Sequence, residues 1–283
     1  MNKPLVIVER RGAVGILTLK NPARRNVLSR AMLVAIRDGL IGLLRSPETS
    51  GATGSASAEP VRRGPQSLSL SNADVRCIVL RAAGPAFSAG HDLREIVEAS
   101  PEERESLFAL CTEVMEAVRN ALVPVIAQVQ GIATAAGCQL VASCDLVVAS
   151  REASFATPGV KIGLFCSTPA VALSRAVAPK KAMEMLLTGQ PIPAVEAERI
   201  GLVNRVVPAE RLEEETLALA TQIADASGYT LGLGKRAFYE QLALDRSRAY
   251  ELAQKAMVEN AAADDAREGM LAFLEKRQPR WRD

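Results

Sequence analysis

The beginning of the chain carries apolar patterns of two kinds, one with the period of a strand and one with the period of a helix. Two β-rich runs, Leu5–Glu9 and Val14–Leu19, are separated by Arg-Arg-Gly, which predicts a hairpin. A helix is predicted next, because Ser29 is a residue type that caps helix N-termini and a helical period begins after it. Its apolar positions are Leu33, Ile36, Leu40 and Leu43.

Three further runs are rich in β-branched residues and alternate with helical stretches. They are Val75–Leu80, Val125–Val129 and Leu146–Ala149. Strands that alternate with helices in this way are typical of βαβ units and a parallel sheet. We therefore assign residues 1–207 to an α/β core.

Two other segments differ from this core in composition. Residues 46–73 are rich in Ser, Gly, Ala and Pro, and we interpret them as a flexible exposed insertion without function, with a partner-binding loop as the alternative. From Pro208 onward the pattern is almost wholly helical. Residues 208–283 are therefore predicted to form a C-terminal helical region that packs on the core or on a neighbouring subunit.

The charge balance indicates neither a nucleic-acid nor a membrane partner. Among 283 residues, 34 Lys and Arg stand against 32 Asp and Glu, a net charge of +2 that gives no polyanion-binding footprint. The apolar run at the start is short and soon followed by charges, unlike a signal or transit segment. No stretch approaches the roughly 20 apolar residues of a spanning helix. A cytoplasmic location is the resulting expectation.

Cysteine and histidine usage limits the chemistry further. His91 is the only histidine, which excludes a His-rich metal site, and we expect no metal ion. The cysteines lack paired spacing and lie in mostly apolar surroundings, so they are predicted to be buried free thiols. They are Cys77, Cys111, Cys138, Cys144 and Cys166.

Two segments depart from simple amphipathic patterning, Pro85–Leu93 (PAFSAGHDL) and Gly131–Asp145 (GIATAAGCQLVASCD). Each follows a strand and is rich in small residues where the chain turns toward a helix. Backbone N–H groups can approach a ligand at such turns, and two turns side by side could aim two donors at one oxygen. Close helix packing is the alternative explanation for the small residues.

Together these segments resemble the crotonase (enoyl-CoA hydratase/isomerase) superfamily, and the resemblance extends nearly from end to end. The matching pieces, in order, are Asn21–Leu28 (NPARRNVL), AFSAGHDL, Pro124–Gly131 (PVIAQVQG), Gly137–Leu140 (GCQL) and Phe273–Pro279 (FLEKRQP). The resemblance implies an α/β spiral of ββα units with a helical C-terminal region, assembled as a homotrimer or homohexamer.

The resemblance also implies an acyl-CoA thioester substrate, with coenzyme A as part of the substrate and no separate cofactor. By position, the backbone N–H groups of His91 and Ala136 would form the oxyanion hole. Lys and Arg suit a ligand that bears several phosphate charges. The positions that match the family's CoA contacts are Ala23, Arg24, Val27 and Ala89, together with Phe273 and Lys276 from an adjacent subunit.

The sequence departs from the resembled hydratases at both catalytic acids. Those enzymes hold a water between two carboxylates. The first acid position is Gln139 here, and the second is Gly159, which has no side chain. Losing one general acid or base typically costs about 10²- to 10⁴-fold in rate, so standard two-glutamate hydration is not supported.

Few other acids are available to replace them. Asp92 is interpreted as a helix cap, Glu95 and Glu98 as solvent-facing, and Asp145 as structural. For His91, the alternatives are a backbone contribution only, or an imidazole that donates a proton or contacts a substrate carboxylate.

Three functions stay open at this point. The first is an enoyl-CoA lyase or isomerase with a substitute acid. The second is an acyl-CoA decarboxylase or thioester hydrolase that relies on the oxyanion hole. The third is a non-catalytic acyl-CoA-binding protein.

Overall fold

The computed structural model describes residues 3–45 and 75–282, so the predicted insertion at 46–73 lies outside the described residues. A six-stranded sheet forms the larger layer, with strand order β1-β2-β3-β5-β7-β10. β1 and β2 are the antiparallel hairpin expected from the sequence, and the remaining neighbours pair in parallel. The strands are β1 Val6–Arg11, β2 Val14–Leu19, β3 Cys77–Ala82, β5 Val125–Val129, β7 Leu146–Ser150 and β10 Arg205–Val207.

A smaller four-stranded sheet has the order β4-β6-β8-β9. Each of its first three strands directly follows a strand of the larger sheet, so β3 leads to β4, β5 to β6 and β7 to β8, with helices after each pair. This repetition is the ββα spiral that the resemblance implied. The strands are β4 Ala86–Ser88, β6 Ile132–Thr134, β8 Ser154–Ala156 and β9 Ile192–Pro193.

Helices and short 3-10 turns connect and cover the sheets. The helices are α1 Arg30–Leu44, α2 Leu93–Glu98, α3 Pro101–Arg119, α4 Ala136–Ser143, α5 Ser167–Ala176, α6 Pro179–Thr188, α7 Ala194–Arg199, α8 Leu212–Ala224, α9 Gly228–Gln241, α10 Arg246–Ala261 and α11 Asp264–Leu274. The 3-10 turns are η1 Pro22–Arg24, η3 Pro158–Ile162 and η4 Ala209–Arg211.

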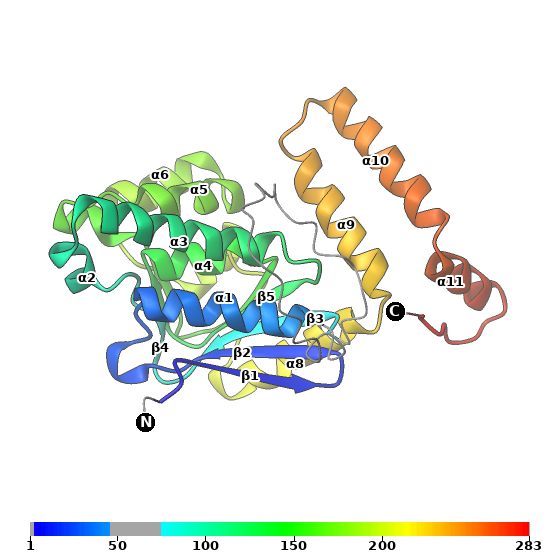
Figure 1. Cartoon of the computed structure of the whole chain (residues 1–283), viewed down its shortest axis with the longest axis horizontal. Helices are drawn as coiled ribbons and strands as arrows, with labels where there is room; N and C mark the ends of the chain where they lie inside the picture. The colour runs from blue at the N-terminus through cyan, green and yellow to red at the C-terminus, as the bar shows by residue number, and fades with distance from the viewer. Residues whose placement is uncertain (1–2, 46–74, 283) are drawn as a thin grey trace, which may run out of the picture.

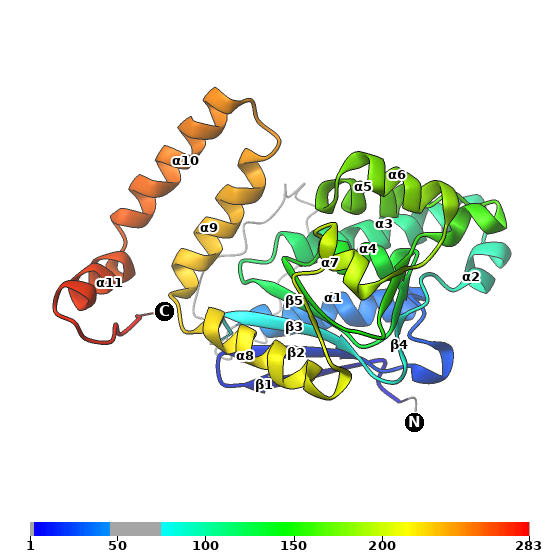
Figure 2. The same ribbon diagram turned by 180° about the vertical axis from the view of Figure 1, so that it is seen from behind.

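The central strands are mostly apolar because the larger sheet is covered on both faces. Alternate residues of β3 enter different cores: Ile78 and Leu80 pack with α1, whereas Cys77 and Val79 pack with α8. Figures 1 and 2, taken from opposite sides, show α1 in front of the sheet in one view and α8 in front in the other. The smaller sheet lies beside the α1 face and carries the turns that build the site.

Predicted caps and thiols agree with the structure. The side chain of Ser29 accepts a hydrogen bond from the backbone N–H of Met32 and so caps α1. All five cysteines are buried and free, as expected. Burial raises the pKa of Cys77, Cys111 and Cys138 to about 12, which makes these thiols poor nucleophiles.

One buried ion pair holds α9 against the core. Lys235 Nζ lies 2.6 Å from Asp145 Oδ2, and the two side chains are only 7% and 13% exposed. The Tyr239 hydroxyl donates to Asp145 Oδ1 at 2.9 Å, and the backbone N–H of Val125 donates to Oδ2 at 2.7 Å. Asp145 is therefore structural, as predicted, because its two oxygens join α9 to the start of β5.

The last two helices, α10 and α11, project away from the body of the molecule (Figure 1). α10 has no buried residue, and large apolar side chains on α10 and α11 are exposed. They include Tyr250, Met257, Val258, Met270, Phe273 and Leu274. Among residues 3–45 and 75–282, no helix is both long and apolar enough to cross a membrane.

Candidate active site

Backbone hydrogen bonds join the segment around η1 to the loop that follows β4. This loop contains Gly90, His91 and Asp92, and we call it the GHD loop. The N–H of Leu28 donates to Gly90 O at 2.8 Å, and the N–H of Ala89 donates to Arg25 O at 3.0 Å. The amide of Asn26 donates to the carbonyls of Ala83 and Ala86, and Asn26 itself is fully buried. Two segments about sixty residues apart in the sequence thus form one continuous wall.

The GHD loop also lies against the start of α4. A Cβ added to Gly90 would be 2.9 Å from Ala135 Cβ and 3.3 Å from the backbone nitrogen of Ala136, and Gly90 has a φ of +82°. Only glycine therefore fits this contact. The two turns predicted to carry the oxyanion donors are side by side.

The residue before α4 has an unusual backbone conformation. Ala135 has φ 51° and ψ −119°, a region that non-glycine residues rarely occupy. Such strain tends to concentrate where the surrounding structure holds a functional group in place. Within the described residues, the backbone N–H groups of His91 and Ala136 donate no hydrogen bond. Both therefore remain able to bind a ligand oxygen.

The imidazole of His91 is held in one orientation. Its Nδ1 lies 3.2 Å from the carbonyl oxygen of Leu28, and Phe108 packs edge-on with the ring centroids 5.4 Å apart. Because a carbonyl can only accept, Nδ1 carries the proton and donates it, which leaves a lone pair on Nε2. Nε2 is buried and has no partner within the described residues. Burial lowers the pKa of His91, so the ring is a neutral acceptor and is not set up as a proton donor.

We expect the free energy of unfolding to decrease as the pH falls below the ordinary histidine pKa of 6.5, because the pKa of His91 is lowered only in the folded state. Between the two pKa values the unfolded chain binds more protons, so stability drops by at most about 1.4 kcal/mol per pH unit. Urea unfolding at about pH 7 and about pH 5.5 should show this slope in the wild type and a shallower one in His91→Gln. Equal slopes in the two proteins would contradict a neutral buried imidazole.

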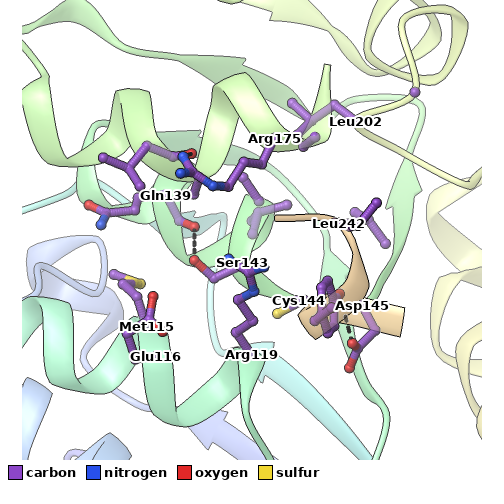
Figure 3. A pocket seen from close by; sticks show the side chains of 18 of the residues that line it. Met115, Glu116, Arg119, Gln139, Ser143, Cys144, Asp145, Arg175, Leu202 and Leu242 are labelled. Carbon is purple, nitrogen blue, oxygen red and sulfur yellow. Dashed lines mark hydrogen bonds between the residues drawn. The ribbon is translucent and has the colours of Figure 1, made fainter. Parts of the chain in front are cut away.

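Gln139, at the first acid position, is on α4 one turn after Ala136 and is only 5% exposed. Its amide oxygen has no hydrogen-bond partner within the described residues. The side chain lines a cavity of about 670 Å³ (Figure 3) between α3, α4, α5 and α9. We call this space the α4 cavity. Of the site residues predicted from the sequence, Gln139 is the one that lines it.

Gly159, at the second acid position, lies in η3 in a space that excludes any side chain. A Cβ there would be 1.9 Å from the carbonyl oxygen of Leu164 and 2.8 Å from Cys166 Sγ. The N–H of Leu164 also donates to the carbonyl of Gly159 at 3.0 Å, which closes this turn. The position that the resemblance matches to the second carboxylate is therefore closed by folded backbone and leaves no room for a side chain.

The substitute acids considered from the sequence are engaged elsewhere or exposed. Asp92 caps α2, as predicted, and its carboxylate also pairs with Arg24 at 2.7 Å. Glu95 accepts from the backbone N–H of Arg30 at 2.9 Å and is only half-buried, so the prediction that it faces solvent holds in part. Glu98 is exposed, as predicted. Bound or exposed carboxylates of this kind are poor substitutes for a proton-transferring acid.

The residues matched to CoA contacts fall in two places. Ala23 and Arg24 are in η1, and Val27 and Ala89 lie beside them in the wall formed with the GHD loop. Phe273, which is 83% exposed, and Lys276 lie at and just after the end of α11. With α10, this helix projects from the body of the molecule (Figure 2). Within one chain, the structure therefore brings four of these positions together and leaves the last two apart.

Four polar residues near the site were not found from the sequence. The hydroxyls of Thr134, the last residue of β6, and Thr157, which precedes η3, are buried without a partner within the described residues. Arg119 and Arg175 line the α4 cavity from α3 and α5. Thr134 and Thr157 lie in or beside segments that the sequence singles out, but nothing in the sequence marks their hydroxyls as unpartnered. Arg119 and Arg175 belong to no recognisable motif, so only the fold shows that they lie near the site.

Comparison with known proteins identifies the class to which this fold and site belong. The Enoyl-CoA hydratase/isomerase family model matches residues 65–283, and the chain belongs to that family. Mouse enoyl-CoA hydratase domain-containing protein 3, mitochondrial, is 48% identical over 94% of this chain and 80% of its own length. The human protein of the same name is 46% identical over 94% of this chain and 79% of its own length.

Solved structures give the same answer for the fold. The crystal structure of human enoyl-coenzyme A hydratase domain-containing protein 3 has a TM-score of 0.86 and 45% identity, covering 99% of this chain and 100% of that one. An enoyl-CoA hydratase structure from Mycobacterium smegmatis has a TM-score of 0.87 and 44% identity with the same coverage. The crotonase-type fold predicted from the sequence is confirmed.

The cytoplasmic location expected from the sequence is wrong in the light of these relatives. The mouse, rat and human proteins and a relative from Dictyostelium discoideum are all named mitochondrial. The expectation rested on the composition of the first residues and on the lack of a membrane-spanning stretch, which are weak guides to location.

Proposed function

We propose that this protein binds acyl-CoA thioesters and polarises the thioester carbonyl with the backbone N–H groups of His91 and Ala136. The observation that carries the proposal is the contact between Gly90 and the Ala135–Ala136 turn. This contact places the backbone N–H groups of His91 and Ala136, which donate no hydrogen bond within the described residues, on neighbouring loops. Preorganised backbone donors at the end of a helix stabilise negative charge on an oxygen without reorganising. Family membership supports the acyl-CoA class of ligand.

Hydration by the two-carboxylate route is not part of this proposal. Gln139 cannot accept a proton, and the space beside Gly159 is filled by the Leu164 carbonyl and Cys166. A site with both donors and neither acid can bind and polarise a thioester but cannot transfer protons between water and carbon.

A second candidate is thioester hydrolysis with His91 as base, and the unpartnered Nε2 lone pair favours it. Water would lose a proton to Nε2 as its oxygen bonds to the carbonyl carbon, and the C–S bond would then break. The coenzyme A thiolate would leave and take that proton. Decarboxylation with His91 as proton donor is less well supported, because burial holds the imidazole neutral.

We also propose a homotrimer or homohexamer. Its support is the apolar surface of α10 and α11, where Phe273, Leu274 and Val258 are 83%, 74% and 71% exposed in the single chain. Large exposed apolar patches usually mark interaction surfaces. In such an assembly Phe273 and Lys276 would reach a neighbour's CoA, as the resemblance implied.

Calorimetry with crotonyl-CoA should show binding, while hydration of the same compound stays at least about 10²-fold below a typical enzyme turnover of about 10 s⁻¹. Gly90→Ala should abolish most of the affinity, since its Cβ would push the Ala135 turn away. Gly12→Ala is the matched control, because Gly12 also has a positive φ of +58° but nothing lies within 4 Å of its Cβ position.

Three outcomes of this experiment are informative. No binding to millimolar thioester would refute the proposed function. If Gly90→Ala and Gly12→Ala bind crotonyl-CoA with equal affinity, the loops that carry His91 and Ala136 do not hold the thioester. If the wild type releases free coenzyme A thiol from the thioester and His91→Gln does not, the protein is a thioester hydrolase that uses His91.

A further inference from the structure

We propose that the α4 cavity receives the far end of the acyl group and selects acyl chains that end in a carboxylate. This inference rests on the proposed function, because the thioester must first be held at the start of α4. The cavity, of about 670 Å³, is within the size range of small-molecule sites.

Helix α4 connects the proposed thioester site to the cavity. Ala136, Gln139 and Ser143 follow one another at helical spacing on one face, and the last two line the cavity. Helical side chains lean toward the N-terminus, so the buried Gln139 covers the turn that begins at Ala136. From Ala136 to Ser143 the helix rises by about 10 Å, so the cavity lies within reach of an extended acyl chain whose thioester is held at Ala136.

Most of the cavity wall is apolar and suits the methylene part of such a chain. The apolar lining residues come from all four helices and from the segment before β10. They include Met115, Val141, Val171, Leu202, Phe238 and Leu242.

Two guanidinium groups provide the charge that a terminal carboxylate would meet. Figure 3 shows Arg175 and Arg119 on opposite sides of Ser143. Within the described residues, neither arginine forms an ion pair, and the side chain of Arg175 donates only to the Val171 carbonyl of its own helix at 2.9 Å. Arginine matches the planar geometry of a carboxylate and forms strong charge-assisted hydrogen bonds with it.

Arg119 is also held in position. Its guanidinium carbon lies 4.7 Å from the ring centroid of Tyr239, whose hydroxyl is fixed by Asp145. A guanidinium that is already stacked loses less freedom on binding an anion.

The acidic groups in the lining do not cancel this charge. Asp145 is neutralised by Lys235 at 2.6 Å. Glu116 is exposed and accepts from the Asn120 amide at 3.1 Å. Two arginines against one unneutralised glutamate leave the wall positive, which favours an anionic chain end over a methyl or a cationic one.

The test compares two CoA thioesters of equal length, octanedioyl-CoA and octanoyl-CoA, by calorimetry on the intact protein. We expect the wild type to bind octanedioyl-CoA at least about ten-fold more tightly, the effect of one charged hydrogen bond. Arg119→Met and Arg175→Met should each reduce this ratio, because only octanedioyl-CoA presents a carboxylate to the guanidinium groups. Arg151→Met is the matched control, because Arg151 is exposed, outside the cavity, and should keep the ratio.

Each result bears on the inference. Equal affinities for the two thioesters, or a preference that survives in both cavity variants, would overturn it while the proposed function stands. Binding of neither thioester would refute the proposed function itself. Circular dichroism of the variants establishes that any lost preference is not lost folding.

Discussion

Replacing Gly159 by alanine is expected to lower the free energy of unfolding by more than about 4 kcal/mol, or to prevent folding. The added Cβ would lie 1.9 Å from the Leu164 carbonyl oxygen, which is backbone and cannot rotate away as a side chain would. Gly159→Glu should fail for the same reason. A hydratase carboxylate therefore cannot be restored at this position by substitution alone, even in combination with Gln139→Glu.

The matched control is Gly234→Ala in α9, where nothing lies within 4 Å of the added Cβ. An alanine inside a helix should stabilise by about 0.5–1 kcal/mol relative to glycine. Urea unfolding at neutral pH compares the two variants directly. A Gly159→Ala protein as stable as the wild type would mean that the η3 turn can rearrange and admit a side chain.

The second large effect is expected at the ion pair between α9 and the core. Lys235→Met should cost about 3–5 kcal/mol, because it leaves the buried carboxylate of Asp145 without its cation. Burial already lowers the pKa of Lys235, with Asp145 opposing this effect, so the charge depends on its partner. Asp145→Asn combined with Lys235→Met should recover part of the loss, since the uncompensated charge is then absent.

Lys181→Met serves as the control for this pair. Lys181 contacts Glu184 and Glu196 at 2.8 and 3.0 Å, at the surface, where ion pairs contribute little. Its effect on urea unfolding should be a small fraction of that of Lys235→Met. Similar losses in the two variants would show that burial does not decide the strength of the Lys235 pair.

Most of the fold followed from local patterns in the sequence. The predicted ranges for β2 and β5 coincide with the observed strands, because both are buried runs with clear ends. β3 was predicted at Val75–Leu80 but runs from Cys77 to Ala82, where its partner Val14–Leu19 sets the ends. Pairing between distant segments fixes such boundaries, and local composition does not contain that information.

The site was predictable only as far as its motifs extend. The adjacency of the GHD loop and the start of α4 followed from small residues after strands, and the structure confirms it. The obstruction at Gly159 depends on the path of the chain through Leu164, which no motif encodes. Arg119 and Arg175 reach one cavity from separate helices, so only the packing of α3 and α5 reveals them.

The attachment of α9 through Lys235 divides the C-terminal region into two parts of different cooperativity. α8 packs its buried residues against the sheet, and α9 is joined to the core through the buried Lys235–Asp145 pair, whereas α10 has no buried residue in the single chain. Amide hydrogens of α9 should therefore exchange with solvent only when the core opens, and those of α10 should exchange through local opening. Because Phe238 and Tyr239 of α9 also line the α4 cavity, a molecule bound there would slow exchange in α9 and leave α10 unchanged.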